Sequence, residues 1–393
     1  MAAKKILIIS HKAPYPKVDG GAIAISQTIE GLSNRNHKLW VLSMETEKHP
    51  SEGVENTDKL NYKGHKVITK IKAFDALLNL VSKESYILSR FDQSSFEKEL
   101  IGLLNSEEFD CIILESLFTS SYLNTIRRLS NAKLIYRSHN IEHLIWKRYS
   151  GKSKNILKSC YLKLQAKRLE KTELAFWNKV DAIASISSED SKIMQSHTQT
   201  RILNVPVYAD NEKLKMEDSS NTLDFFHLGS MDWLPNKEGI DWLLKNVWPE
   251  VTKMAKDAEL YIAGRNMPSK LLNISMKGYN NKGSVANADE FMCSHKVMLV
   301  PLFSASGMRV KIVEAMALGK CIITTSIGAE GIPYKHLDNL IIANTAEEFI
   351  QMILYCINNS KEVDRIADRA RETIKDSFSQ KVIMGTFERL LEY

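Results

Sequence analysis

Apolar residues fall in short consecutive runs, separated by longer segments with apolar residues at every third or fourth position. Residues 4–10, 111–114 and 297–302 contain the consecutive runs that are typical of parallel strands buried on both faces. Helical spacing follows the first run, between residues 22 and 33. This alternation predicts βα units and places the chain in the α/β class. We expect further strands at 39–42, 134–137, 180–186, 260–263 and 321–325, from Leu223 onward and within 278–286, and helices at 346–358 and 364–375.

A polar stretch divides the chain near its middle. Residues 205–221 are rich in charged and hydroxyl side chains and interrupt the βα pattern, as an interdomain linker does. We therefore expect two doubly wound, Rossmann-like domains that face each other across a cleft, over residues 1–206 and 207–378. Residues 180–186 are then the last strand of the first domain, and Ser188 is expected to cap the helix that follows. Residues 44–67 are polar and are interpreted as a surface excursion.

The segment at 297–332 carries charges in an unusual place. Arg309 and Lys311 stand in the first turn of the predicted helix, where the macrodipole already presents positive charge and acidic residues are favoured. An anion at this end explains them, because Gly307 lets the backbone approach a phosphate or diphosphate and the two cations neutralise it. Glu314 lies about one turn further on, where it can accept hydrogen bonds from sugar hydroxyls. The alternative is an ordinary strand–helix–strand unit with solvated charges. Gly319 is expected to end the helix in a left-handed conformation.

Two other positions are candidates for function. Gly20 and Gly21 stand between the first strand and its helix, where glycine either makes a turn or lets a ligand come close to the backbone. His139 follows a strand in an open α/β sheet, at the end where ligands gather, although a lone histidine is more often structural.

Composition and charge narrow the class of protein. The chain has 393 residues, 44% hydrophobic and 25% charged, as soluble globular proteins have. Its five cysteines show no paired spacing, which indicates neither a disulfide framework nor a metal site and favours a reducing cytoplasm. The first apolar run is too short for a signal peptide, and no later run reaches a membrane span.

The net charge of +6 is unevenly distributed. Residues 144–179, which begin at Leu144 and end at Lys179, contain ten basic and two acidic residues. Three interpretations remain open: a solvated helical face, contact with an anionic membrane surface through lysines interleaved with apolar residues such as Leu157, Leu169 and Trp177, or nucleic-acid binding. The last is disfavoured because no recognition motif accompanies the charge.

Several motifs resemble one enzyme family. The run SGMRVKIVEAMALGKCIITTSIGAEGI is similar to the nucleotide-sugar signature of retaining glycosyltransferases of the GT-B fold, family four (glycosyl transferases group 1). SHN-x-E at 138–142 resembles the family's HD or HN motif. The opening unit of the family, PYP-x-x-x-GG followed by L-x-x-x-x-H, matches Pro14, Tyr15, Pro16, Gly20, Gly21, Leu32 and His37.

The resemblance implies roles for particular residues. Glu314 would hold the ribose, Arg309 and Lys311 the diphosphate, and His139 would reach the donor sugar. Ser306 stands where the family usually has a first glutamate that touches this sugar, and Ser230 and Met231 replace an arginine. The catalytic set is thus His139, Arg309, Lys311 and Glu314, and residues 379–393 would return to the first domain, as in GT-B enzymes. The expected donor-binding residues are Gly20, Gly21, Gly229, Lys237, Ser306, Gly307, Met308, Arg309, Lys311 and Glu314.

The function that follows is transfer of a sugar from a nucleoside diphosphate sugar to an acceptor hydroxyl with retention. We expect no cofactor and no metal, because the cations supply the charge and the chain has no Asp-x-Asp pair. The acceptor would be a glycan or a lipid-linked glycan, and the enzyme would be cytoplasmic or peripheral on the inner face of the membrane. A non-catalytic sugar-nucleotide-binding protein and a GT-B fold epimerase are the alternatives.

Overall fold

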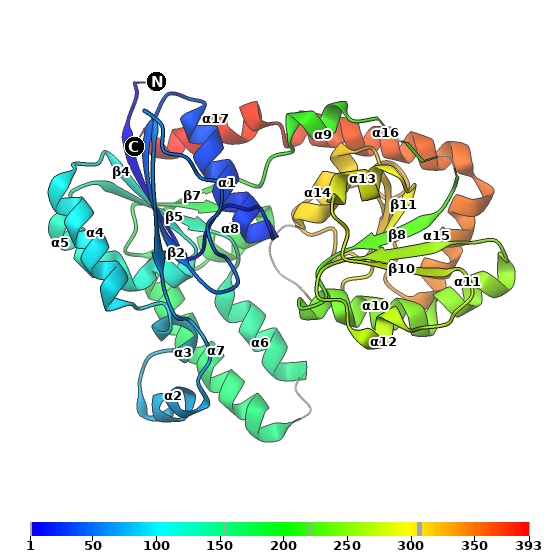
Figure 1. The fold of residues 1–393 in the computed structure, drawn as a ribbon, viewed down its shortest axis with the longest axis horizontal. Helices are drawn as coiled ribbons and strands as arrows, with labels where there is room; N and C mark the ends of the chain where they lie inside the picture. Colours follow the sequence, from blue (N-terminus) through cyan, green and yellow to red (C-terminus); the bar gives the residue numbers. More distant parts are fainter. Residues whose placement is uncertain (1, 153–154, 218, 221, 305–308, 393) are drawn as a thin grey trace. The chain divides into compact units, whose positions relative to one another are not determined.

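The computed structural model describes residues 2–152, 155–217, 219–220, 222–304 and 309–392 (Figure 1). The chain forms two compact units. Unit 1 comprises Met1–Val207 and Ile383–Tyr393, and unit 2 comprises Tyr208–Val382. The division between Val207 and Tyr208 falls within the polar stretch of the sequence. No helix in the described ranges is both long and apolar enough to cross a membrane.

Unit 1 is built on a parallel sheet with helices between its strands. The strands are β1 (Lys5–Ser10), β2 (Lys38–Glu45), β3 (Leu60–Lys66), β4 (Cys111–Glu115), β5 (Lys133–Ser138), β6 (Ala182–Ser185) and β7 (Arg201–Asn204). The helices are α1 (Gly20–Ser33), α2 (Ala73–Leu78), α3 (Tyr86–Ser89), α4 (Ser94–Ser106), α5 (Leu123–Leu129), α6 (Glu142–Lys152), α7 (Ile156–Trp177) and α8 (Ser188–Gln195), with the 3₁₀ turns η1 (Asn79–Val81) and η2 (Leu117–Tyr122). The seven strands lie in the order β3-β2-β1-β4-β5-β6-β7.

Unit 2 repeats the same plan. Its strands are β8 (Phe225–Leu228), β9 (Leu260–Ala263), β10 (Tyr279–Gly283), β11 (Val297–Val300), β12 (Cys321–Thr324) and β13 (Ile341–Ile342), in the order β10-β9-β8-β11-β12-β13. Its helices are α9 (Asn211–Lys215), α10 (Leu234–Asn246), α11 (Trp248–Met254), α12 (Ser269–Leu272), α13 (Ala288–Cys293), α14 (Val310–Ala317), α15 (Ala346–Asn358) and α16 (Ser360–Ser377). Figure 1 shows α13 and α14 on one side of this sheet and α10 and α12 on the other.

Both sheets confirm the predicted doubly wound α/β class. Neighbouring strands pair in parallel throughout, and the central strands β4, β8, β11 and β12 are buried at every position. The strand order reverses beside β1 in unit 1 and beside β8 in unit 2. The carboxyl ends of the strands at these switch points are where ligands bind in such folds.

Some edge elements differ from the prediction. β3 lies within the segment for which the sequence predicts a surface excursion, and none of its residues is buried, because it is an edge strand. β7 follows the strand predicted to be the last of the first domain. The helix cap is one residue earlier than expected, because the hydroxyl of Ser187 accepts the amide of Asp190 at 3.0 Å and α8 begins at Ser188.

The last helix, α17 (Gln380–Leu391), carries the end of the chain into unit 1. Met384 and Phe387 are buried, and a Cβ at Gly31 of α1 would lie 2.5 Å from the sulfur of Met384, so the two helices pack closely there. Arg35 Nε lies 3.0 Å from Glu388 Oε2. The end of the chain is therefore part of the core of unit 1.

Candidate functional site

In unit 2 the backbone is tightly packed at the carboxyl ends of the strands. A Cβ at Gly239 of α10 would lie 2.0 Å from the carbonyl oxygen of Pro301, which follows β11. A Cβ at Gly264, after β9, would lie 1.8 Å from the carbonyl oxygen of Gly229. Glycine is therefore required at both positions for α10 and the strand ends to meet at the switch point. Gly229 ends β8 as expected, and Lys237 is an exposed residue of α10.

Two of the predicted residues, Lys311 and Glu314, lie together on α14, and Arg309 stands at the start of this helix. Arg309 is the N-cap residue and is buried, with Nη2 3.4 Å from the carbonyl oxygen of Ile327 and 3.7 Å from Glu330 Oε2. Lys311 Nζ lies 2.8 Å from Glu314 Oε2, one turn along the helix. Gly319 adopts φ 67° just after the helix, as predicted. Ser306, Gly307 and Met308 lie outside the described residues.

Glu314 is the centre of a small charged cluster in unit 2. Its side chain is 12% exposed, and besides Lys311 it meets Lys213 of α9, whose Nζ lies 2.8 Å from Oε1. Lys213 also lies 2.6 Å from Asp289 Oδ1 at the start of α13. Helices α9 and α14, distant in sequence, thus place two lysines around one carboxylate, and α13 adds Asp289. Neither Lys213 nor Asp289 was predicted.

The cluster keeps Glu314 ionised. Burial raises the pKa of its carboxyl, but the charges of Lys311 and Lys213 outweigh burial and the net pKa is lowered. Burial likewise lowers the pKa of Lys213, whereas Glu314 and Asp289 raise it to a net value above the ordinary one. A buried, ionised carboxylate is a strong acceptor for hydroxyl groups once a competing ammonium moves aside.

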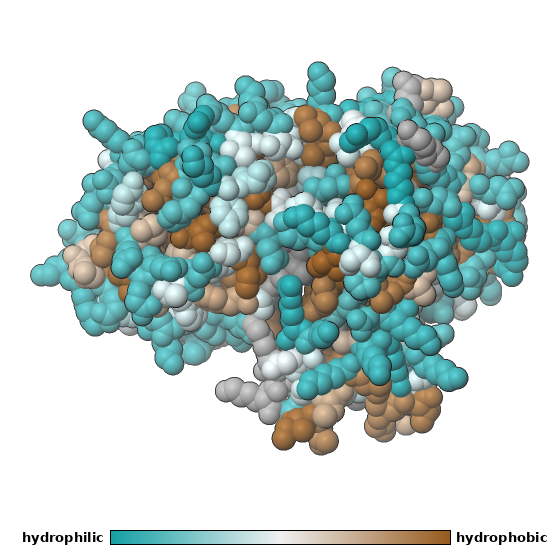
Figure 2. All heavy atoms as spheres, turned by 180° about the vertical axis from the view of Figure 1, so that it is seen from behind, coloured by the Kyte–Doolittle hydropathy of each residue, from teal (hydrophilic) through white to brown (hydrophobic). Residues whose placement is uncertain are grey.

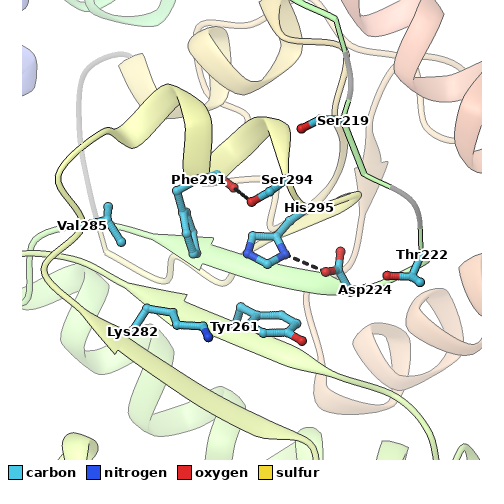
Figure 3. Close-up of a pocket in the computed structure, with 9 residues that line it drawn as sticks. All are labelled: Ser219, Thr222, Asp224, Tyr261, Lys282, Val285, Phe291, Ser294 and His295. Carbon is cyan, nitrogen blue, oxygen red and sulfur yellow. Dashed lines mark hydrogen bonds and ion pairs between the residues drawn. The ribbon is translucent and has the colours of Figure 1, made fainter.

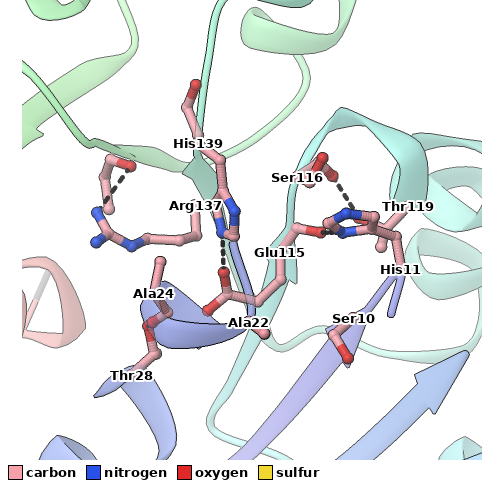
Figure 4. Close-up of polar contacts among 12 residues, drawn as sticks. Ser10, His11, Ala22, Ala24, Thr28, Glu115, Ser116, Thr119, Arg137 and His139 are labelled. Atoms are coloured by element: carbon pink, nitrogen blue, oxygen red, sulfur yellow. Dashed lines mark hydrogen bonds and ion pairs between the residues drawn. The ribbon is translucent and has the colours of Figure 1, made fainter. Parts of the chain in front are cut away.

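In unit 1, His139 meets a carboxylate that the sequence did not single out (Figure 4). His139 follows β5, and its Nε2 lies 2.5 Å from Oε2 of Glu115, the last residue of β4. His11 follows β1, and its Nδ1 donates to the carbonyl oxygen of Glu115 at 3.2 Å. Three adjacent strands, β1, β4 and β5, therefore end in one polar group at the switch point.

The electrostatics of this group are set by burial. Burial and the nearby charges of Lys12 and His139 lower the pKa of His11 well below its usual range, so its ring is neutral near pH 7. Arg137 of β5 is also buried, and it donates to the carbonyl oxygen of Val205. Burial lowers the pKa of Arg137 to about 10, against the opposing charge of Glu115. Glu115 is fully buried, and its Oε1 has no hydrogen-bond partner within the described chain.

Gly20 and Gly21 are the first two residues of α1. Asp19 caps the helix by accepting the amide of Ala22 at 2.8 Å, and Lys12 Nζ lies 2.7 Å from the same carboxylate oxygen. A Cβ at Gly21 would lie 2.5 Å from Lys12 Nζ, so any larger residue would displace this lysine. The amino end of α1 is thus held at the carboxyl edge of the sheet, the position at which helix dipoles favour anions.

Glu142, the glutamate of SHN-x-E, is buried beside a second carboxylate. Glu173 of α7 accepts the amides of Glu142 and His143, each at 3.0 Å, and so caps α6. Burial, together with the charge of Glu173, raises the pKa of Glu142 to about 7. This carboxyl therefore titrates near neutral pH.

The predicted residues belong to both units. Arg309, Lys311 and Glu314 lie on or at the start of α14 in unit 2, whereas His139 lies in unit 1 with Glu115 and His11. Glu115 could have been found from sequence, because it is a charge that closes an otherwise apolar strand in the run CIILE.

One hollow of unit 2 lies elsewhere. It has a volume of about 640 Å³ and contains none of the predicted residues (Figure 3). His295, before β11, lies 2.6 Å from Asp224, before β8, so the pocket is near the amino ends of these strands. No group of three His, Cys, Asp or Glu side chains in the described residues is arranged to hold a metal ion.

Comparison with known families identifies part of the chain. Residues 222–359 match the family model described as Glycosyl transferases group 1. The matched segment includes Arg309, Lys311 and Glu314. This part of unit 2 therefore carries a group 1 glycosyltransferase domain.

Similar proteins cover nearly the whole chain. An uncharacterized 44.6 kDa protein in the cps region of Klebsiella pneumoniae is 24% identical over 402 residues, which cover 97% of this chain and 98% of that protein. Sucrose-phosphate synthase from Thermosynechococcus elongatus has a TM-score of 0.72 at 13% identity, covering 98% of each chain. Anabaena HepE in complex with UDP has a TM-score of 0.66 at 13% identity, covering 98% of this chain and 99% of that one. The fold is that of the GT-B glycosyltransferases.

Proposed function

We propose that this protein is a retaining glycosyltransferase that moves a sugar from a nucleoside diphosphate sugar to an acceptor hydroxyl. The premise is the group 1 glycosyltransferase domain at residues 222–359. The observation that carries the proposal is the Lys311–Glu314 pair on α14, the helix whose N-cap residue is the buried Arg309. Positively charged side chains suit the diphosphate of the donor, and a carboxylate one helical turn away suits the hydroxyl groups of its ribose.

The chemistry asked of these residues is charge stabilisation. In the transfer, the bond between the anomeric carbon and the diphosphate oxygen breaks with its electron pair passing to the diphosphate, and the acceptor oxygen bonds to that carbon as its hydroxyl proton passes to the departing diphosphate. The departing diphosphate gains negative charge, which Arg309, Lys311 and the amino end of α14 would stabilise. Because these groups are already positively charged, the proposed reaction is metal-independent.

Glu314 would accept the ribose hydroxyls. Its Oε1 faces Lys213 and its Oε2 faces Lys311, both at 2.8 Å. Since the pKa of Glu314 is lowered, the carboxylate is ionised at neutral pH and ready to accept. The ribose would take the place of Lys213, which keeps Asp289 as a partner at 2.6 Å.

On unit 1, His139 would contact the donor sugar. The carboxylate of Glu115 fixes the orientation of its ring through Nε2. Gly20 and Gly21 would let the amino end of α1 approach the donor phosphates or the acceptor.

We further propose a role in cell-surface glycan or glycolipid synthesis, at the inner face of the membrane. The relative from a cps region supports this assignment. The segment 144–179, which forms most of α6 and α7, would attract an anionic membrane surface through its basic residues. Reversing Lys158, Lys163 and Lys167 to Glu should then weaken binding to anionic vesicles, and binding should fall with added salt.

A screen of nucleotide sugars by thermal shift tests the donor. A donor at 100 times its Kd stabilises the folded protein by about 2.7 kcal/mol. UDP and UDP-glucose are included because HepE was solved with each of them. Failure of every nucleotide sugar to raise the melting temperature would sink the proposal.

Product analysis then separates the alternatives. Transfer to an acceptor with the anomeric configuration unchanged supports the proposal. Binding without transfer or donor hydrolysis indicates a non-catalytic binding protein, and conversion of the donor without an acceptor indicates an epimerase.

A further inference from the structure

Exposed apolar side chains are concentrated on one part of unit 1. Fifteen large apolar side chains are exposed in the described part of the chain, and nine of them lie in residues 68–81 and 156–157. Val81 is 92% exposed and Leu157 is 83% exposed. Figure 2 shows them as brown surface at the lower edge of the view, over α2 and the amino end of α7. We call residues 68–81 and 156–157 the apolar surface.

The backbone of this surface is held by specific hydrogen bonds. Arg168 of α7 donates to the carbonyl oxygens of Asn79 and Leu80, at 2.8 and 2.9 Å. Gln165 of α7 donates to the side chain of Asn79 at 2.9 Å and accepts the amide of Tyr86 at 2.8 Å. The polar groups of η1 are therefore satisfied on the α7 side, while its apolar side chains remain in water. Such a fixed, water-exposed apolar surface marks an interaction site.

Basic residues surround the apolar surface. Lys66, Lys70, Lys72 and Lys83 are exposed around 68–81, where Asp75 and Glu84 are acidic and Glu47 pairs with Lys70 at 2.8 Å. Lys158, Lys163 and Lys167 are exposed along α7. Apolar side chains beside exposed lysines complement a bilayer with anionic headgroups, because lysine stems lie along apolar surface while their ammonium groups reach the phosphates. A second copy of this chain would bring the same positive charges together.

We propose that the apolar surface inserts into an anionic lipid bilayer and docks unit 1 on the membrane. The inference deepens the membrane contact proposed above and rests on that part of the proposed function. It also changes which residues make the contact. In α7, Leu169 and Trp177 belong to the core of unit 1, and Leu157 is among the few apolar residues of that helix that face water. Insertion therefore depends mainly on α2 and η1, with α7 supplying charge.

Sedimentation with vesicles of phosphatidylcholine containing about one third phosphatidylglycerol tests the proposal. A variant with Phe74→Ser, Val81→Ser and Leu157→Ser should bind at least tenfold more weakly than wild type, because each apolar side chain contributes by leaving water. The matched control is Met254→Ser in unit 2, since Met254 and Phe74 are each 69% exposed. The control should bind like wild type.

Salt separates insertion from simple attraction. At about 1 M salt the Debye length is about 3 Å, so electrostatic binding is lost whereas insertion persists in part. Wild type should keep part of its binding at this salt concentration, and the serine variant should keep none. The proposal is overturned if wild type ignores anionic vesicles, if the serine variant binds equally well, or if vesicles of phosphatidylcholine alone bind as tightly. If wild type is a dimer and the serine variant is a monomer, the apolar surface binds a second copy of this chain instead.

Donor binding makes the two proposals separable. The serine variant should be stabilised by nucleotide sugars as much as wild type, because Phe74, Val81 and Leu157 are not among the residues assigned to the donor in either unit. If no nucleotide sugar binds wild type but vesicle binding depends on Phe74, Val81 and Leu157, the glycosyltransferase proposal is wrong and the membrane-docking proposal is supported.

Discussion

Replacing Glu142 by glutamine should change how the stability of unit 1 depends on pH. Glu142 is 7% exposed, and burial with the charge of Glu173 raises its pKa from 4.5 to about 7. The folded state therefore holds this proton more tightly than the unfolded chain does. Its contribution to stability is complete below the unfolded pKa of 4.5 and is lost as the pH rises through about 7.

The size of the effect follows from the shift in pKa. One pKa unit corresponds to about 1.4 kcal/mol, so the full contribution is about 3 kcal/mol. Between pH 5.5 and pH 8 the wild-type protein should lose about 2 kcal/mol of it. Glutamine has the shape of the protonated acid and does not ionise. Glu142→Gln should therefore gain about 2 kcal/mol relative to wild type over this interval.

Urea unfolding at pH 5.5 and pH 8, followed by circular dichroism, measures the difference. Glu170→Gln is the control, because Glu170 lies on α7 with a side chain that is 42% exposed and should show no such gain. If Glu142→Gln and wild type lose stability equally between the two pH values, Glu142 is already ionised at pH 5.5. Burial would then raise the pKa of Glu142 to a value below about 7.

Four further outcomes are expected at the site. Glu314→Gln should weaken donor binding by about 1.5–3 kcal/mol, the range for a hydrogen bond to a charged group, and unchanged affinity in calorimetry would remove Glu314 from the ribose site. Arg309→Ala and Lys311→Ala should weaken binding of a nucleoside diphosphate but hardly affect the nucleoside, because their role is attraction to phosphate; equal losses for both ligands would contradict that role. Transfer should continue in excess EDTA, and complete loss with rescue by magnesium or manganese would refute metal independence. Glu115→Gln should lower kcat at least about tenfold with little change in KM, since it removes the carboxylate that orients the ring of His139; a variant with wild-type kcat would make Glu115 purely structural.

The sequence identified the strands that are buried on both faces. β4 and β11 are apolar at nearly every position, and the sheet around them excludes water from both sides. Edge strands gave a weaker signal, because one side of β3 and of β7 faces solvent and their side chains are polar or mixed. β13 has only two residues, too few for any periodicity. Hydrophobic patterning therefore predicts the centre of a sheet better than its edges.

Contacts within the candidate site were predictable only between residues of one helix. Lys311 and Glu314 are three residues apart, so helical geometry alone brings them together. Lys213 approaches Glu314 from 101 residues away, on a five-residue helix without a buried side chain, where the sequence resembles a linker. Glu115 and His139 meet because β4 and β5 are neighbours in the sheet, and strand order had to be known first.

The return of α17 to unit 1 has a consequence for how the protein is made. Ile383–Tyr393 are synthesised after the whole of unit 2 but belong to the same unit as Met1–Val207. Amino-terminal domains usually fold first during synthesis, but here the pocket for Met384 and Phe387 stays unfilled until α17 has been synthesised. Unit 2, which is continuous in sequence, can fold earlier. Truncation of the chain before α17 would therefore damage the unit whose synthesis began first.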